Sequence, residues 1–331
     1  DEPFDLERAE LLSYNRRLEM GDGLVRREVV FLTPTGKRIR LTSTRLVSFD
    51  HRHLAAIAYE VVPLDADAEL IISSEMINRS PLPVETADPR MAQGFVGRVL
   101  RPEGHVVDGH RAILSFTTQS SGLTLGCGMD HVIETDCACT TDARCEDDLA
   151  AVVFKVRGEA GKPVRLVKLL SYHHGARTTP KEIRSQTAWT LDRALEDGFD
   201  RVLERQQAYV RAFWEHADIE VEGGRTPEKQ QVIRWNLFQL LQASGRAEGH
   251  GIGARGLTGQ TYEGHSFWDT EFYVLPFLVY TNPRMARSIL MHRYDQLTKA
   301  RARARELGHP GASFPWRTIN GDEASAYYAA G

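Results

Sequence analysis

The sequence predicts a protein of two parts, a β-rich part over residues 1–215 and a helical part after it. Up to about residue 215, short segments that alternate apolar and charged residues are separated by turn signals, which is typical of an antiparallel β-sandwich. From Thr179 onward the apolar residues recur with the spacing of helices. The 331 residues, 42% of them hydrophobic, are enough for two domains with a sizeable core.

Several strands are expected in the first part, at residues 23–31, 37–43, 53–62, 69–74, 112–117, 149–156 and 164–171. The first two form a hairpin, because Pro34 and Gly36 stand at turn positions between them. Each strand has a charged face, so we expect sheets with one side in water. The segment Asn78–Arg101 is rich in proline and polar residues and is expected to be a loop.

Helices are expected in the second part. One opens at Thr179-Pro180 and runs to about Phe213. A second begins at Thr226, with Pro227 in the first turn, and ends by Gly245. A third begins after Asn282, and Gly308 stops it. We place the domain boundary near residues 215–228 and interpret residues 216–250 as linker helices.

Composition excludes several classes of protein. A formal net charge of -4 provides no electrostatic basis for binding nucleic acid. The longest apolar run, Phe272–Tyr280, is too short for a membrane span and contains Pro276, and no signal peptide is visible. We therefore expect a cytoplasmic protein that binds no membrane. Because the chain starts at Asp1 without Met and stops at Gly331 within a glycine-rich motif, we expect a fragment.

The cysteines allow two interpretations. All four lie close together, at Cys127, Cys137, Cys139 and Cys145, and His131 could add a further ligand, so a zinc site is one alternative. The spacing lacks the paired knuckles of structural zinc sites. Reduced cysteines in a cytosolic protein are the favoured interpretation, and no metal site is predicted.

The glycines of the stretch 251–271 match a dinucleotide-binding pattern at Gly251, Gly253 and Gly256. That pattern needs a strand before it and a helix after it, and here a predicted helix precedes it. The sequence also contains neither a phosphate-binding P-loop motif nor the glycine-flanked serine of hydrolases. Nucleotide binding and a serine nucleophile are therefore not expected.

Two loops combine aromatic and acidic residues. The first contains His265, Trp268, Asp269 and Glu271, and the second runs through Phe314–Glu323 and includes Trp316 and Glu323. Tyr327 and Tyr328 follow. An aromatic ring stacks on the apolar face of a sugar, and a carboxylate accepts hydrogen bonds from its hydroxyl groups. Asp269 and Glu271 are two residues apart, so on a helix one can face a cavity while the other braces it. A core role for Trp268 is the alternative, but two such loops indicate a carbohydrate cleft.

At these residues the chain resembles glycoside hydrolase family 65, the phosphorylases of maltose, trehalose, kojibiose and related α-glucosides together with a few hydrolases. The motif GHSFWDTE at residues 264–271 is highly specific, and Asp22–Ser48 is similar to the N-terminal β-sandwich of the family. The resemblance implies a β-sandwich over 1–215, linker helices, and the first part of an (α/α)6 barrel over 251–331, truncated at its end.

The resemblance also implies roles for individual residues. Trp268 and Asp269 match positions that bind the non-reducing glucose, and Arg293 lies in a similar H-R-Y stretch that braces the cleft. We take His265, Glu271 and Trp316 as further substrate-binding candidates. The general acid of the family is a glutamate expected beyond residue 331, so Glu323 is the best available carboxylate for catalysis and a stronger candidate for shaping the cleft.

The implied activity is inverting phosphorolysis of an α-linked glucose disaccharide, of maltose, trehalose or kojibiose type, to β-glucose 1-phosphate and glucose. Phosphate is a co-substrate and no cofactor is needed; the expected partners are the disaccharide, phosphate and a second copy of the chain in a homodimer. Hydrolysis by water, as in a trehalase or a kojibiose hydrolase, is one alternative. A module that only binds carbohydrate is another, and we expect the 331-residue chain alone to be inactive.

Overall fold

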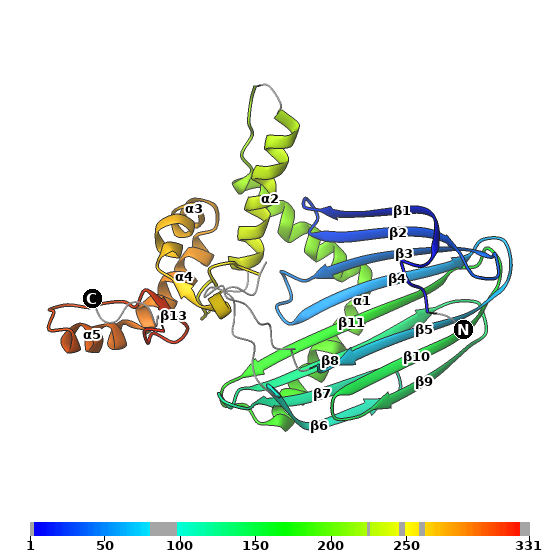
Figure 1. Cartoon of the computed structure of the whole chain (residues 1–331), viewed down its shortest axis with the longest axis horizontal. Coiled ribbons are helices and arrows are strands. Elements are labelled where there is room, and N and C mark those ends of the chain that lie inside the picture. Colours follow the sequence, from blue (N-terminus) through cyan, green and yellow to red (C-terminus); the bar gives the residue numbers. More distant parts are fainter. Residues whose placement is uncertain (1–2, 80–97, 224–225, 245–248, 258–261, 325–331) are drawn as a thin grey trace. The chain divides into compact units, whose positions relative to one another are not determined.

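The computed structural model describes residues 3–79, 98–223, 226–244, 249–257 and 262–324 (Figure 1). The chain divides into two compact units. The first, here called the β-rich unit, comprises Asp1–Pro81 and Phe95–Val210, and the second, the helical unit, includes Arg211–Gly331. The predicted order of a β-rich part followed by a helical part is confirmed. No helix of the described residues is long and apolar enough to cross a bilayer.

The β-rich unit contains two antiparallel sheets. The large sheet has eight strands in the order β1 (Glu10–Glu19), β2 (Leu24–Leu32), β3 (Arg38–Val47), β4 (Leu54–Pro63), β11 (Val164–Gly175), β8 (Thr124–Glu134), β7 (Arg111–Thr118) and β6 (Leu100–Asp108). The small sheet has the order β5 (Ala68–Ile77), β10 (Leu149–Gly158) and β9 (Cys139–Cys145). Every predicted strand is present.

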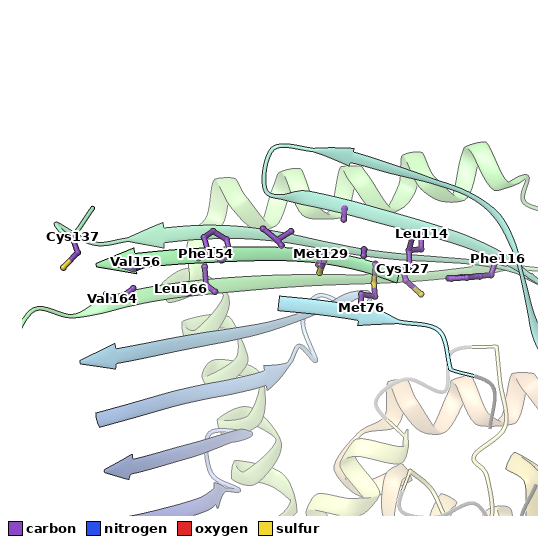
Figure 2. Packing of buried hydrophobic residues seen from close by; sticks show 13 residues of the cluster. Met76, Leu114, Phe116, Cys127, Met129, Cys137, Phe154, Val156, Val164 and Leu166 are labelled. Carbon is purple, nitrogen blue, oxygen red and sulfur yellow. The ribbon is translucent and has the colours of Figure 1, made fainter. Parts of the chain in front are cut away.

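The small sheet packs on one face of the large sheet and forms the main core. Figure 2 shows Phe154 of β10 between the sheets, together with Met129 of β8 and Leu114 of β7. All three side chains are at most 1% exposed. Because inward and outward residues alternate along each strand, this core comes from the apolar alternation that predicted the strands.

The opposite face of the large sheet is covered by helix α1 (Pro180–Ala217), so the expectation of one wet side is wrong for the central strands. Leu191 and Ala194 of α1 pack against Val167 and Leu169 of β11 and against Ile113 of β7. Helix α1 starts where predicted, since the Thr179 hydroxyl accepts from the Glu182 N–H (3.3 Å) and the Glu182 carboxylate accepts from the Thr179 N–H (2.8 Å). The helix is interrupted at Gly198 (φ 72°), which was not predicted.

Strands β1, β6, β8 and β9 were not predicted. Strand β8 carries Gly126 and Gly128, which resemble turn signals in sequence. In the structure a Cβ at Gly126 would lie 2.5 Å from the Thr187 Oγ1 of α1, so this glycine permits the close approach of the helix. Strand β6 begins inside the expected loop Asn78–Arg101, and residues 80–97 of that loop lie outside the described part of the chain.

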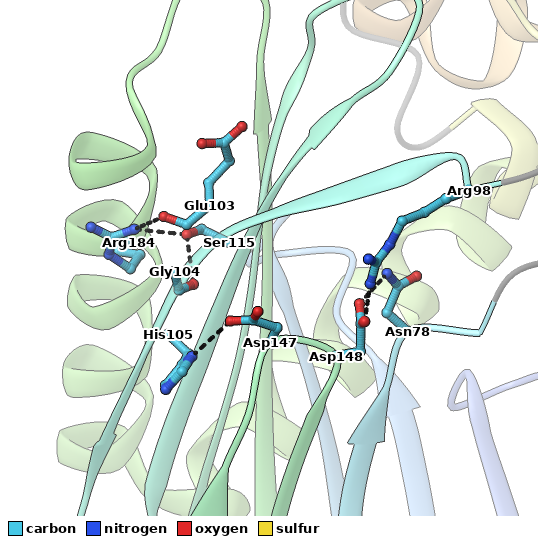
Figure 3. A network of polar contacts seen from close by, with 9 residues as sticks. All are labelled: Asn78, Arg98, Glu103, Gly104, His105, Ser115, Asp147, Asp148 and Arg184. Atoms are coloured by element: carbon cyan, nitrogen blue, oxygen red, sulfur yellow. Dashed lines mark hydrogen bonds and ion pairs between the residues drawn. The ribbon is translucent and has the colours of Figure 1, made fainter.

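Polar contacts hold β6 in place (Figure 3). Arg184 of α1 donates to the Ser115 hydroxyl (2.7 Å) and to the Glu103 carbonyl (3.3 Å). Just before the start of β6, Arg98 donates to the Asp148 carboxylate, which also accepts from the Asn78 side-chain amide. These bonds tie the edge of the large sheet to α1 and to the turn before β10.

The helical unit contains α2 (Thr226–Ser244), α3 (Leu275–Thr281), α4 (Pro283–Asp295) and α5 (Leu297–Glu306). A short η1 turn (Tyr262–Gly264) and a π-helix η2 (Thr270–Val274) precede α3, and the strands β12 (Ser266–Phe267) and β13 (Arg317–Thr318) pair with each other. The predicted cap is confirmed, since the Asn282 side chain accepts from the Met285 N–H. The single helix expected up to Gly308 is instead α4 and α5, separated by a tight turn in which the Gln296 N–H bonds to the Arg293 carbonyl.

Candidate carbohydrate site

The first loop, described over residues 249–257 and 262–269, turns sharply at residues 262–264, just before Trp268. Tyr262 and Glu263 have positive φ values of 62° and 52°, followed by Gly264 at 74°. Such backbone is uncommon and strained in non-glycine residues, and it clusters at functional sites. The turn is closed by the His265 N–H and by the His265 ring Nδ1, which both donate to the Tyr262 carbonyl, at 2.9 and 2.8 Å. His265 therefore braces the loop from inside.

The glycines at the start of this loop permit close packing. A Cβ at Gly251 would lie 2.8 Å from the Ser266 hydroxyl oxygen and 3.0 Å from the His292 Nε2. Only a residue without a side chain fits between β12 and α4 at this point. Packing within the unit thus accounts for the glycine at position 251.

The second loop, residues 307–324, is closed by Glu323. The carboxylate of Glu323 accepts from the backbone N–H groups of Trp316 (2.8 Å) and Arg317 (3.2 Å) and lies 3.3 Å from Arg303 of α5. Both of its oxygens are therefore engaged by the loop that they hold. These contacts favour the positioning role that was expected for Glu323 over a direct role in catalysis.

Pairing of β12 with β13 brings the two loops together. Ser266 is paired with Thr318, and the Ser266 hydroxyl donates to the Thr318 carbonyl (3.0 Å). As a result the Trp268 and Trp316 rings meet edge to face, with centroids 5.4 Å apart. Both rings remain accessible, Trp268 being 46% and Trp316 37% exposed. The two aromatic residues that the sequence assigned to different loops thus form one exposed surface.

Asp269 lies next to this surface at the start of the π-helix η2. Its side chain makes no capping hydrogen bond and is exposed. Within the described residues, its carboxylate has no hydrogen-bonding or ionic partner. Asp269 is therefore available to accept hydrogen bonds from a ligand that sits beside Trp268.

Below the surface, Glu271 forms an ion pair with Arg293 of α4. Arg293 is 8% exposed, and its Nε and Nη2 donate to the two carboxylate oxygens of Glu271 at 2.7 and 3.3 Å. The two acids therefore differ in their contacts: Glu271 is bound to Arg293, whereas the Asp269 side chain is exposed and has no partner among the described residues. The bidentate pair fixes the π-helix on α4.

The ion pair continues into a buried polar chain. Arg293 also donates to the Gln296 side-chain oxygen (3.3 Å), and the Gln296 amide lies 2.8 Å from the His292 Nε2. Burial, the largest cause, lowers the pKa of His292 and so favours the neutral ring. The unprotonated Nε2 of a neutral ring can accept from the Gln296 side-chain amide. Gln296 and His292 were missed in the sequence, although Gln296 follows Arg293 by three positions and His292 by four, spacings that bring side chains together on a helix.

Arg317 is another residue that the sequence did not single out. Its Nη2 donates to the Glu263 carboxylate (3.0 Å), which links the strained turn of the first loop to the second loop. Its Nε is buried and has no hydrogen-bond partner among the described residues. Tyr327 and Tyr328, which were expected to extend the aromatic surface, lie outside the described residues.

The alternative zinc site finds no support in the geometry. Cys127, Cys137, Cys139 and Cys145 are free, and in the described part of the chain no group of histidine, cysteine or acidic residues is arranged to hold a metal. His131 is engaged through both ring nitrogens, with the Ser74 hydroxyl (2.7 Å) and the His110 carbonyl (2.8 Å).

Comparison with known proteins identifies the family. Residues 1–213 match the N-terminal domain of glycosyl hydrolase family 65, and residues 234–330 match its central catalytic domain. The chain belongs to glycoside hydrolase family 65. Both loops of the candidate carbohydrate site lie in the part that matches the catalytic domain. The predicted fold class, a β-sandwich followed by helices that begin this domain, is confirmed.

Individual relatives in family 65 cover the whole chain. An uncharacterized glycosyl hydrolase of Mycobacterium tuberculosis is 42% identical over 100% of the chain and 42% of its own length. An alpha,alpha-trehalose phosphorylase of Thermoanaerobacter brockii is 36% identical, over 100% of the chain and 42% of its own length. The solved structure of a putative kojibiose phosphorylase from the human microbiome matches with a TM-score of 0.83 at 26% identity, covering 98% of this chain and 41% of that one. The chain thus spans about two fifths of the length of the curated relatives that it matches.

Proposed function

We propose that the protein catalyses inverting phosphorolysis of an α-linked glucose disaccharide of the trehalose, kojibiose or maltose type. The observation that carries this proposal is the juxtaposition of the exposed Trp268 and Trp316 rings with the unpaired carboxylate of Asp269. This combination is suited to a pyranose, whose apolar face stacks on the rings while its hydroxyl groups donate to the carboxylate. A trehalose phosphorylase and a putative kojibiose phosphorylase among its relatives support the reaction class.

In this proposal inorganic phosphate attacks the anomeric carbon from the face opposite the glycosidic oxygen. The glycosidic bond breaks, a general acid protonates the departing oxygen, and the products are β-glucose 1-phosphate and glucose. Phosphate is itself the nucleophile, so the chemistry requires no base to activate water. Trp268 and Asp269 hold the non-reducing glucose, with Trp316 beside them, whereas His265, Glu271 and Arg293 position the loops that present them. We assign Glu323 to positioning the second loop.

The reaction is tested by incubating the purified full-length protein with trehalose, kojibiose and maltose, with and without phosphate. Phosphate-dependent formation of glucose 1-phosphate from one of them is expected. Equal sugar release without phosphate would instead support the hydrolase alternative, and binding of sugar without any turnover would support the carbohydrate-binding alternative.

The site is tested with Asp269→Ala. Losing a hydrogen bond that strengthens in the transition state should lower kcat/KM by about 10²–10³-fold. Asp108→Asn, an exposed acid at the end of β6, is the control and should leave kcat/KM unchanged. Near-normal kinetics of Asp269→Ala would show that the sugar binds elsewhere.

We further propose residues 216–250 as the linker, residues 251–331 as the first part of the (α/α)6 barrel, and a homodimer as the functional assembly. The matched catalytic-domain residues, 234–330, support the barrel assignment. The four unpaired cysteines suit the reducing cytoplasm, where we place the protein. Sedimentation velocity would test the dimer, since a single species of monomer mass would contradict it.

A further inference from the structure

Three arginines gather on one face of the large sheet in the β-rich unit, in the strands β1, β2 and β3. Arg16 of β1 lies directly opposite Arg27 of β2. Arg27 is paired with Ser43 of β3, and Arg45 follows two residues later on the same strand. Because side chains alternate between the faces of a strand, Arg16, Arg27, Arg45 and Ser43 share one face. The three arginines are called the arginine cluster below.

The arginine cluster lies on the face of the large sheet that also carries the small sheet. Ser43 is paired with Tyr59 of β4, and Tyr59 packs against the buried cluster of Ile39, Val61 and Ala68, the last of which belongs to β5. One row of paired residues therefore crosses the sheet from β4, near β5, to the edge strand β1: Tyr59, Ser43, Arg27 and Arg16. In Figure 1 the small sheet lies by the lower strands of the unit, and β1 and β2 lie at the upper edge of the large sheet.

The arginine cluster has no carboxylate partner in the part of the chain that the structure describes. Among the described residues, none of the three forms an ion pair, whereas Arg17 and Arg26, on the opposite face of the same strands, both pair with Glu19. Like charges directly opposite each other on neighbouring strands destabilise a sheet. The facing pair Arg16 and Arg27 therefore needs a compensating negative charge from outside the row.

Buried donors also lack acceptors at this place. Ser43 is 3% exposed, and its hydroxyl has no hydrogen-bond partner in the described structure. The Arg27 Nε is buried and lacks a partner as well. Partial burial, followed by repulsion from Arg27 and Arg16, lowers the pKa of Arg45. Buried polar groups are almost always satisfied, so two unsatisfied donors on paired residues, one of them belonging to the arginine cluster itself, indicate a ligand that accepts hydrogen bonds.

We propose that the arginine cluster and Ser43 form a binding site for a phosphate-type dianion. Guanidinium groups match the oxygens of a phosphoryl group with paired hydrogen bonds, and three unpaired cations suit a ligand of more than one negative charge. The Ser43 hydroxyl and the Arg27 Nε supply the donors at the floor of the site. This site shares no residue with the carbohydrate site of the helical unit, and its existence does not depend on the proposed reaction.

The phosphoryl group could come from inorganic phosphate or from a sugar phosphate, and both are used as probes. Isothermal titration calorimetry of the purified protein with inorganic phosphate and with glucose 1-phosphate is compared for the wild type and for Arg27→Gln/Arg45→Gln. Two charge-assisted hydrogen-bonding partners are lost, so we expect the double variant to bind at least ~tenfold more weakly. Tighter binding of glucose 1-phosphate than of phosphate, dependent on the same arginines, would identify the sugar phosphate as the ligand.

A matched control removes the same charge elsewhere. Arg144→Gln/Arg157→Gln alters exposed positions on β9 and β10 of the small sheet and should bind both probes like the wild type. A second variant, Ser43→Ala, keeps all the charges and deletes the unpaired hydroxyl; it should fold and bind more weakly. Three outcomes would overturn the proposal. The wild type could fail to bind either probe, or the arginine double variant could bind as tightly as its control. The third outcome is that Trp268→Ala, and not the arginine double variant, loses binding.

Discussion

Replacing Arg293 by methionine should uncouple the π-helix from α4. Arg293 is 8% exposed and holds both carboxylate oxygens of Glu271, at 2.7 and 3.3 Å, as well as the Gln296 side chain. Methionine keeps most of the volume but no hydrogen bond. The Glu271 carboxylate would then remain largely buried without a partner, two residues away from Asp269.

The magnitude follows from the burial of the pair. Removing one partner of a fully buried ion pair costs roughly 3–5 kcal/mol, most of which comes from the charge that stays behind. The side chains of Arg293 and Glu271 are 10% and 22% exposed, so water can reach part of the remaining carboxylate. We therefore expect a loss at the lower end, about 3 kcal/mol, which is more than a hundredfold in the unfolding equilibrium.

Urea unfolding followed by tryptophan fluorescence measures this loss, because Trp268 and Trp316 lie in the same unit as the ion pair. Arg301→Met, an exposed position of α5, is the control and should change the stability by less than about 0.5 kcal/mol. The double variant Arg293→Met/Glu271→Gln should cost less than the sum of the two single variants, since it leaves no buried charge. A loss below about 1 kcal/mol, with additive single variants, is the behaviour of a surface pair and would refute the reasoning.

Three further perturbations are predicted. Asn282→Ala should destabilise the helical unit by about 1 kcal/mol, while Asn282→Asp should not, because only alanine removes the cap of α4; thermal unfolding measures both. Gln206→Leu should cost about 2–3 kcal/mol in chemical denaturation, since the 0%-exposed Gln206 side chain accepts from the Phe49 N–H (2.9 Å) and donates to the Gly23 carbonyl (3.1 Å). Burial lowers the pKa of His131 to about 4, whereas a histidine of the unfolded chain has a pKa near 6.5. Between these two pH values the unfolded chain binds more protons than the folded chain. The free energy of unfolding should therefore fall by up to about 3 kcal/mol as the pH drops from 6.5 to 4. His131→Gln should remove that part of the pH dependence, and an unchanged difference between unfolding at pH 7 and about pH 4.5 would contradict it.

Local patterns predicted a large part of the fold. Strands β2 and β3 were evident because they alternate apolar and charged residues and are separated by a proline and glycine turn. Helix starts at Thr179 and Asn282 were evident because capping uses residues next to each other in sequence. Strand β8 was not evident, because it contains Gly126. A side chain at this position would clash with Thr187, which lies about sixty positions further along the chain. Such a requirement leaves no local pattern.

The sequence by itself determined which residues carry the aromatic and acidic chemistry, the order of the β-rich and helical parts, and the family. Each of these depends on residue types or on short spacings, which act over a few positions of the chain. Only the tertiary structure decided which of these candidate residues are exposed to a ligand and which are bound to other parts of the protein. Trp268, Asp269 and Trp316 are exposed together, whereas Glu271 is bound to Arg293 and Glu323 to its own loop. The pairing of β12 with β13 joins residues that are about fifty positions apart, and the arginine cluster arises from the register of three strands. Contacts of this kind depend on which backbone segments lie side by side, because burial and charge pairing are properties of the folded surface and not of neighbouring residues.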